Sequence, residues 1–218
     1  MVQFGLPQQA DNIPAWFGKL PGTGDFAQRR LAPDFLKLWD GWLERNLRRL
    51  RDERNDWTEH YLEAPLWYFA LGCDIVNANP WVGVLMPSVD AVGRYFPLTL
   101  TIELRACEFD TAASEEMCKI REWWARSADV ALKALDTNQD ALNFETTLYV
   151  AFNSKIETLS RVPNVHQVPL PRNSMWLANL GEKESISHIV NGLPKDNLFE
   201  LLFGYSDITT LDNSQQYD

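Results

Sequence analysis

Residues 95–104 have the sequence YFPLTLTIEL, in which apolar and polar side chains alternate from Leu98 to Leu104. Successive side chains of a β-strand point to opposite faces, so this period of two predicts a half-buried strand. Residues 81–87, WVGVLMP, are rich in β-branched and apolar residues and predict another strand. No helix is expected between the two strands, and strands that follow each other without a crossover helix favour antiparallel pairing.

The rest of the chain supplies further strands and helices. Strands are expected at residues 15–20, 64–72, 174–178 and 184–190, the last two as a hairpin around Gly181; the run 64–72 also fits a short helix. Helices are expected at residues 33–52, 114–135, 140–149 and 198–203. This mixture predicts an α/β fold: a single layered domain with a mixed, partly antiparallel β-sheet flanked by helices on both faces, an αβα sandwich.

The two ends of the chain have no apolar period. We therefore expect a flexible leader at residues 1–14, the α/β domain at residues 15–206, and a flexible tail at residues 207–218. No apolar run is long enough for a transmembrane helix, and the N-terminus has no secretory signal. The three cysteines are an odd number without CxxC spacing. They indicate a reducing compartment, so a cytoplasmic protein is expected, with no insertion into a membrane.

Charge and histidine spacing argue against several kinds of site. The formal net charge is −10, whereas a nucleic-acid surface needs clustered Lys and Arg, so no nucleic acid is expected as a partner. The three histidines, His60, His166 and His188, have no i, i+4 spacing that would indicate a zinc site. Ser88 does not lie in the G-x-S-x-G pattern of a nucleophile elbow. We expect no metal, no cofactor and no assembled catalytic site.

Residues 22–27, GTGDFA, match the dinucleotide-binding pattern G-x-G-x-x-A. The context does not fit, because Pro33 would fall inside the helix that must follow these glycines. The segment is not a phosphate-binding P-loop either, since Lys19 precedes the glycines. Two interpretations stay open: the glycines permit a positive-φ turn beneath packed aromatic rings, or they form a surface loop that contacts a partner.

Asp90 and Arg94 lie four residues apart and can pair if the segment between them forms a helical turn. The pair would then brace the entry to the strand that begins near Tyr95. Alternatively, Arg94 offers its planar guanidinium to a carboxylate or phosphate of a partner. An enzyme, for instance a hydrolase using Asp25, Asp90 and Arg94, would require these groups to converge in a pocket.

Two longer runs resemble the signatures of the TagF family, also called ImpM. Residues 16–26, WFGKLPGTGDF, followed by Arg29-Arg30-Leu31, resemble its opening signature. Residues 81–98, WVGVLMPSVDAVGRYFPL, resemble its second signature. The resemblance extends in weaker form to Met175-Trp176 and to Gly192-Leu193-Pro194, so it covers roughly residues 16–203.

The resemblance implies a cytoplasmic accessory protein of the bacterial type VI secretion system. Such proteins are post-translational regulators, usually repressors of assembly or firing, linked to threonine phosphorylation and to binding a forkhead-associated (Fha) scaffold protein. A structural component of the apparatus is the alternative. Interfaces depend on a few aromatic or Arg anchors, so the partner-binding candidates near the signatures are Asp25, Phe26, Arg29, Arg30 and Arg94. The residues expected to serve the fold itself are Trp16, Gly18, Gly22, Gly24, Gly93 and Pro97.

Overall fold

The structure, a computed structural model, describes residues 4–7, 12–106, 113–154, 162, 167–179 and 185–205. Its centre is a seven-stranded sheet with the strand order β3-β2-β6-β5-β4-β8-β9. The strands are β2 (Ala15–Gly18), β3 (Ala27–Arg29), β4 (Trp67–Leu71), β5 (Trp81–Met86), β6 (Leu98–Glu103), β8 (Asn173–Asn179) and β9 (Ser185–Asn191). A second, two-stranded sheet joins β1 (Phe4–Gly5) to β7 (Arg105–Ala106).

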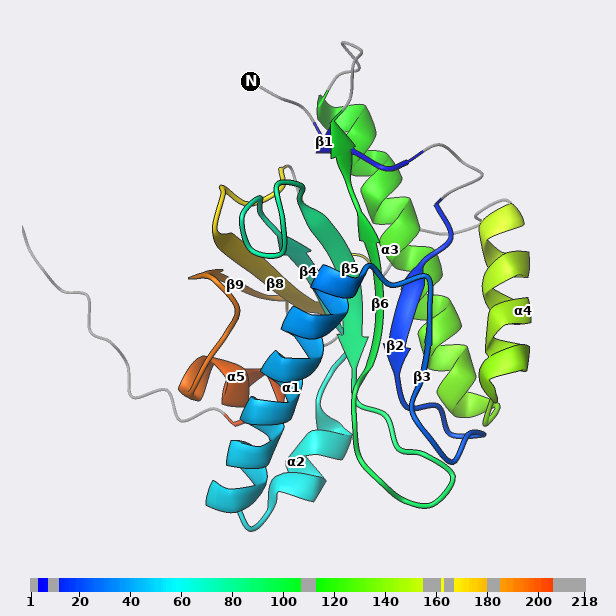
Figure 1. The fold of residues 1–218 in the computed structure, drawn as a ribbon, viewed down its shortest axis with the longest axis vertical. Helices are drawn as coiled ribbons and strands as arrows, with labels where there is room; N and C mark the ends of the chain where they lie inside the picture. The colour runs from blue at the N-terminus through cyan, green and yellow to red at the C-terminus, as the bar shows by residue number, and fades with distance from the viewer. Residues whose placement is uncertain are drawn as a thin grey trace, which may run out of the picture.

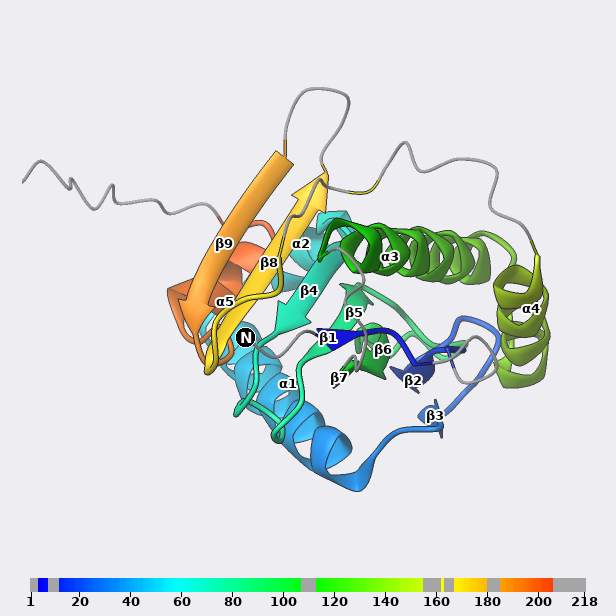
Figure 2. The same cartoon turned by 90° about the horizontal axis from the view of Figure 1, so that it is seen from above.

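Five helices accompany the sheet: α1 (Pro33–Glu53), α2 (Trp57–Glu63), α3 (Ala113–Asp136), α4 (Ala141–Asn153) and α5 (Asn197–Leu202). Their buried residues fall into two apolar clusters. The first cluster unites α1, α2 and α5 with sheet residues such as Phe69 and Trp176. The second unites α3 and α4 with sheet residues such as Val84 and Leu100. Figures 1 and 2 show α1 and α3 on opposite sides of the strands.

The α/β class predicted from the sequence is confirmed, but the expected mixed sheet is wrong. Every strand pairing among the described residues is antiparallel. Four neighbouring pairs, β2–β3, β4–β5, β5–β6 and β8–β9, are consecutive in the chain, and consecutive strands joined by loops pair antiparallel. Helices α1 and α2 lie between β3 and β4 in the chain, and α3 and α4 lie between β7 and β8. Neither pair of strands is adjacent in a sheet, so these helices do not connect parallel neighbours.

Strand β6 is buried on both faces, which corrects the half-buried strand expected from its alternation. Thr99 and Thr101 are fully inaccessible to solvent. The Trp39 Nε1 group donates a hydrogen bond to Thr99 Oγ1 at 2.9 Å, and Thr101 Oγ1 donates to the Val82 carbonyl at 2.9 Å. Buried polar atoms require such partners, and these bonds let threonine occupy a closed core position.

Several expectations concern short or terminal segments. Strand β1 lies within the expected leader and pairs with β7. Helix α2 and strand β3 have no counterpart among the predicted elements. Residues 207–218, the hairpin turn at Gly181, Cys107 and His166 lie outside the described residues. In the part of the chain that the structure describes, no helix is long and apolar enough to cross a membrane.

Candidate functional site

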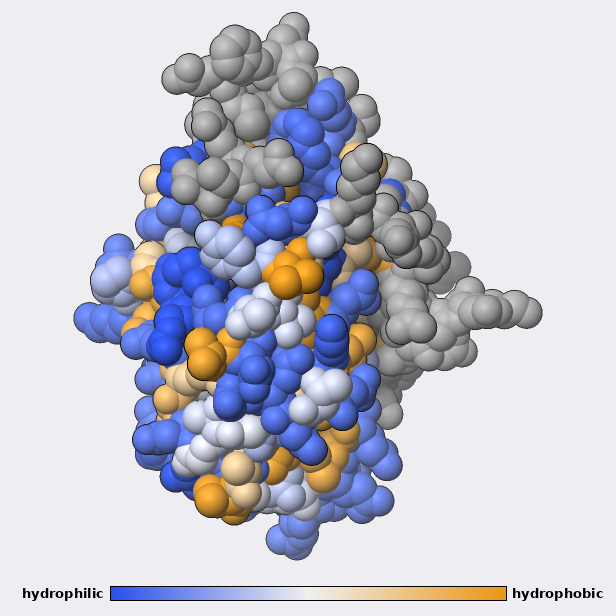
Figure 3. Space-filling model, turned by 90° about the vertical axis from the view of Figure 1, so that its right-hand side faces the viewer, coloured by the Kyte–Doolittle hydropathy of each residue, from blue (hydrophilic) through white to orange (hydrophobic). Residues whose placement is uncertain are grey.

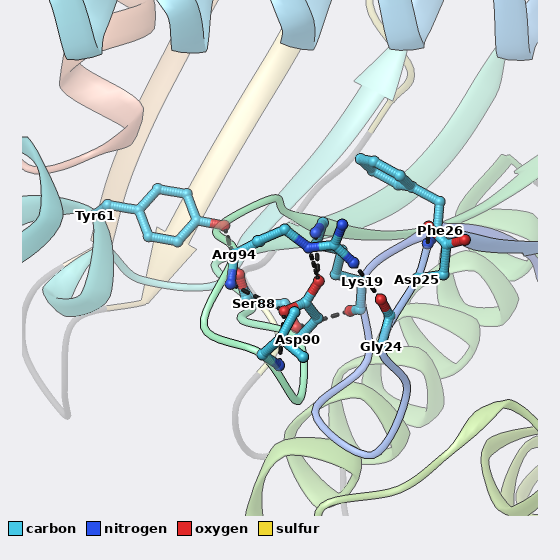
Figure 4. Close-up of polar contacts among 9 residues, drawn as sticks. Lys19, Gly24, Asp25, Phe26, Tyr61, Ser88, Asp90 and Arg94 are labelled. Atoms are coloured by element: carbon cyan, nitrogen blue, oxygen red, sulfur yellow. Dashed lines mark hydrogen bonds and ion pairs between the residues drawn. The ribbon is translucent and has the colours of Figure 1, made fainter.

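The two signature runs meet at one end of the sheet, where two loops lie against each other (Figure 4). The first loop, residues 19–26, leaves β2, and the second, residues 87–97, joins β5 to β6. The Ala91 N–H donates a hydrogen bond to the Thr23 carbonyl at 3.2 Å. Since β2 also pairs with β6, segments far apart in the sequence form one local structure.

Asp90 is the centre of the polar contacts between the loops. Its Oδ2 atom accepts hydrogen bonds from Lys19 Nζ at 2.5 Å and from Arg94 Nε at 2.7 Å. Its Oδ1 atom accepts the backbone N–H groups of Val92 and Arg94 at 3.0 and 2.9 Å. Arg94 also donates to the carbonyl of Gly24 in the first loop. The predicted Asp90–Arg94 pair is therefore present, and it joins both loops.

The charge of Asp90 is held in a site closed to water, since its side chain is 0% exposed and that of Lys19 is 4% exposed. Burial alone would raise the pKa of the Asp90 carboxyl. The hydrogen bonds from Lys19, Arg94 and the backbone outweigh burial and hold this pKa well below its usual range. Asp90 therefore stays ionised, with both oxygens occupied by internal donors.

A second set of hydrogen bonds ties the loops to α2. The Tyr61 hydroxyl donates to the Ser88 carbonyl and accepts the Ser88 N–H, both at 3.0 Å. Ser88 Oγ donates to the Lys19 carbonyl at 2.7 Å. Burial raises the pKa of Tyr61, so its hydroxyl keeps its proton. These contacts give Ser88 a structural role at the junction of both loops and α2.

A positive-φ turn is one of the two interpretations left open by the sequence for the glycines at residues 22–24. Positive φ occurs at Gly18 (136°) and Gly93 (81°), not at Gly22 or Gly24. Gly22 allows the first loop to lie close to the backbone at residues 138–139, because a Cβ there would lie 2.4 Å from the Asn138 carbonyl oxygen. The Gly22 N–H donates a hydrogen bond to the carbonyl of Gln139 at the same place. A Cβ at Gly24 would meet nothing within 4 Å. The positive-φ interpretation is thus wrong for these two glycines.

A pocket of about 530 Å³ opens beside the paired loops. Phe26 stands at its edge with 49% of its surface exposed, edge-on to the ring of Phe96 at 4.8 Å between centroids. Lys19 Nζ lies 4.9 Å from the centre of the Phe26 ring. The lining combines aromatic and aliphatic side chains with charged groups: Lys19, Phe26, Asp40, Glu44, Leu47, Arg51, Trp57, Arg94, Tyr95 and Phe96. A pocket lined by both apolar and charged side chains is suited to binding a side chain of another molecule.

Helix α1 supplies an acidic wall of this pocket. Asp40 and Glu44 lie one turn apart, and burial together with the charge of Glu44 raises the pKa of Asp40. Glu44 pairs with Arg48 at 2.7 Å. Arg51 stacks over the Trp57 ring at 5.9 Å. The i, i+4 spacing of Asp40 and Glu44 was visible in the sequence, but only the fold places them beside the loops.

The five partner-binding candidates do not form one group. Phe26 and Arg94 line the pocket. Asp25 is exposed beside it, with its Oδ1 accepting the Phe26 N–H at 2.8 Å, and Arg29 is exposed on β3. Arg30 turns away toward α4, where it bonds Glu145 Oε2 at 2.7 Å and the Pro14 carbonyl at 2.8 Å.

Of the residues that line the pocket, the sequence pointed only to Phe26 and Arg94 and missed the others, among them Lys19, Asp40 and Trp57. Lys19 stands inside the first signature, but its pairing with Asp90 spans 71 positions and leaves no local signal. Trp57 belongs to the unpredicted helix α2. The proposed hydrolase group is divided: Asp90 and Arg94 are paired, whereas Asp25 bonds its own neighbour. Among the described residues, no three His, Cys, Asp or Glu side chains are grouped to hold a metal ion.

Asp90 should make the stability of the protein depend on acid pH. Its folded pKa is lowered, so the unfolded chain binds its proton first as pH falls. The stabilisation is complete well above the unfolded pKa of about 4 and is lost progressively below it. The free energy of unfolding, measured with urea, should decline between about pH 6 and pH 3, and this decline should be shallower in Asp90→Asn. Equal slopes in the two proteins would contradict this assignment.

Comparison with known proteins identifies the family. Residues 15–150 match the family described as the TagF N-terminal domain, type VI secretion system-associated. No curated protein matches the chain. The crystal structure of PA0076 from Pseudomonas aeruginosa PAO1 is similar, with a TM-score of 0.67 and 25% sequence identity; the match covers 91% of this chain and 97% of that one.

The family match thus assigns this α/β fold, with its paired signature loops, to a class of type VI secretion system-associated proteins. The family match spans more than half of the chain, including both signature runs and helix α1. The chain belongs to the TagF family, as its two signatures predicted.

Proposed function

We propose that this protein is a cytoplasmic regulator of type VI secretion that acts by binding another protein, an Fha-type scaffold, and thereby represses assembly or firing. Membership of the TagF family supports the secretion system as its setting. The mechanism is occupancy: while the scaffold is bound, it is withheld from the apparatus. No chemical turnover is required for this action.

The observation that carries the proposal is the exposure of Phe26 over a preformed pocket. Large aromatic side chains are normally buried, and they dominate protein interfaces when exposed in a defined setting. Phe26 is held in place by the rings of Phe17 and Phe96 and by the cation of Lys19. It is therefore presented at the surface as a fixed anchor beside a recess.

The same geometry supports binding over hydrolysis. A general base needs a lone pair directed at its substrate. Both oxygens of Asp90 already accept internal donors, and its side chain is inaccessible. Asp90 and Arg94 accordingly shape the surface, and we propose no catalytic role for them. A structural component of the apparatus remains the alternative within the same secretion system.

The scaffold interaction can be tested with purified protein and the Fha-type scaffold from the same gene cluster. Phe26→Ala should weaken binding about thirtyfold, corresponding to about 2 kcal/mol for an interface anchor. Leu62→Ala is the matched control, since Leu62 is 55% exposed on α2 but does not line the pocket. Equal affinity of both variants would remove Phe26 from the interface, and no binding by the unchanged protein would remove the scaffold as partner.

Repression is tested separately by deleting the gene and imaging sheath assembly in cells. More frequent assembly is expected if the protein is a repressor. Complete loss of assembly would instead indicate the structural component, and stoichiometric recovery with purified apparatus would support that alternative.

A further inference from the structure

Helix α4 has apolar side chains on two sides. Its inner side chains, Phe144, Leu148 and Phe152, are buried against the sheet and α3. On its outer side, Leu142 is 77% exposed, and Tyr149 and Val150 are each 62% exposed. Figure 3 shows the side of the molecule that carries α4, where apolar side chains reach the surface. A helix with apolar residues on both sides is typical of one that is covered on both sides.

Two polar side chains on the outer side of this helix already bond within it. Thr146 Oγ1 donates to the Leu142 carbonyl at 3.0 Å, and Asn153 Nδ2 donates to the Tyr149 carbonyl at 2.8 Å. Each donor bonds the carbonyl four residues earlier in its own helix. Covering the outer side would therefore leave these donors satisfied, which avoids the main cost of burying a polar group.

The outer side is also electrically neutral. Glu145 is the only charged residue of α4, and it accepts hydrogen bonds from Arg30 and from Trp16. Burial would raise the pKa of Glu145, but these bonds outweigh it and keep the pKa low, so the carboxylate stays paired with Arg30. Two copies of a chain with net charge −10 repel each other over most of their surface. The exposed apolar side chains of Leu142, Tyr149 and Val150 form a stripe without charge, so two copies can approach each other there with less repulsion.

We infer that the outer side of α4 binds the same side of α4 in a second copy of this chain. The stripe is complementary to itself, since Leu142 and Val150 each lie four residues from Thr146. In an antiparallel pair with a two-fold axis at Thr146, Leu142 of each copy packs against Val150 of the other. The short Thr146 side chain at the crossing point permits the close helix–helix distance of about 8–10 Å.

The contact is small, because a helix of this length spans only about 20 Å. Interfaces at the low end of the usual size range form reversible complexes. The dimer should accordingly dissociate on dilution, with monomer and dimer exchanging over micromolar concentrations of protein. This association does not involve the pocket beside Phe26, so scaffold binding and self-association can succeed or fail independently.

Sedimentation equilibrium of the full chain between about 1 and 200 µM tests the inference. The unchanged protein should shift from monomer to dimer, and Val150→Glu should weaken association at least tenfold by placing like charges in the contact. Leu62→Glu, at another exposed apolar position, should leave association unchanged. A protein that stays monomeric throughout, or a Val150→Glu variant that dimerises as strongly, would overturn the inference.

Cysteine cross-linking tests the position of the axis. With Cys73, Cys107 and Cys118 changed to Ser, Thr146→Cys should form a disulfide-linked dimer under mild oxidation. Thr147→Cys is the matched control, because position 147 lies about 100° further round the helix. Circular dichroism confirms that both variants are folded. Equal cross-linking of the two would exclude a two-fold axis at Thr146.

Discussion

Replacing Gly18 with Ala is expected to cause the largest loss of stability of any single methyl addition in the two signatures. Gly18 has φ 136°, a conformation that side chains rarely adopt, and an added Cβ would lie 2.1 Å from the Pro97 carbonyl oxygen. The two strands cannot separate without breaking the pairing of β2 with β6. We expect a loss of about 4 kcal/mol or more in the free energy of unfolding, measured by urea titration.

Gly24→Ala is the matched control, since the same methyl group there meets nothing within 4 Å and φ is not positive. Its stability should change by less than about 0.5 kcal/mol. If Gly18→Ala cannot be purified in folded form, the comparison of soluble yields gives the same answer. Equal yields and equal unfolding midpoints for the two variants would refute the close-contact explanation.

Asp90→Asn is expected to destabilise the protein by about 3 kcal/mol or more, because it leaves Lys19 as a charge without its counter-ion in a site closed to water. Arg94 would keep access to solvent, so Lys19 is the group that bears the loss. Guanidinium unfolding at pH 7 measures the change. Asp25→Asn, an exposed carboxylate in the neighbouring loop, should have little effect.

The double variant Lys19→Met, Asp90→Asn separates charge from packing. With both charges removed, it should be more stable than Asp90→Asn alone, since no buried charge is then left unpaired. A double variant as unstable as the sum of the losses in Lys19→Met and Asp90→Asn would show that the two side chains are not coupled, and that Asp90 stabilises the loops through Arg94 and the backbone N–H groups instead.

Helices and strands with a long local pattern of apolar residues could be predicted from the sequence. The helix expected at 33–52 corresponds to α1, and the predicted strands and final hairpin correspond to β2, β4, β5, β6, β8 and β9. Period alone could not reveal that Thr99 and Thr101 are buried, because their partners Trp39 and Val82 become neighbours only in the folded chain. Helix α2 was missed because seven residues give too short a pattern.

The candidate site was predictable in its parts but not in its arrangement. The Asp90–Arg94 pair follows from spacing of four residues, and it is present. Arg30 looked like a surface anchor because its neighbours carry the signature, yet it bonds Glu145, 115 positions away. The pocket depends on contacts between the loops, α1 and α2. Contacts between residues far apart in the chain leave no local pattern in a single sequence.

The hydrogen bonds of Lys19, Ser88, Asp90 and Arg94 fix the two loops, and this affects the rate at which a partner can associate. Loops that order themselves only on contact lose conformational entropy at that moment and slow the encounter. Here the ordering is complete before any partner arrives, since Ser88 bonds both Tyr61 and Lys19. If the proposed scaffold binds at this surface, these loops need no rearrangement, so association should follow a single exponential whose rate constant rises linearly with scaffold concentration.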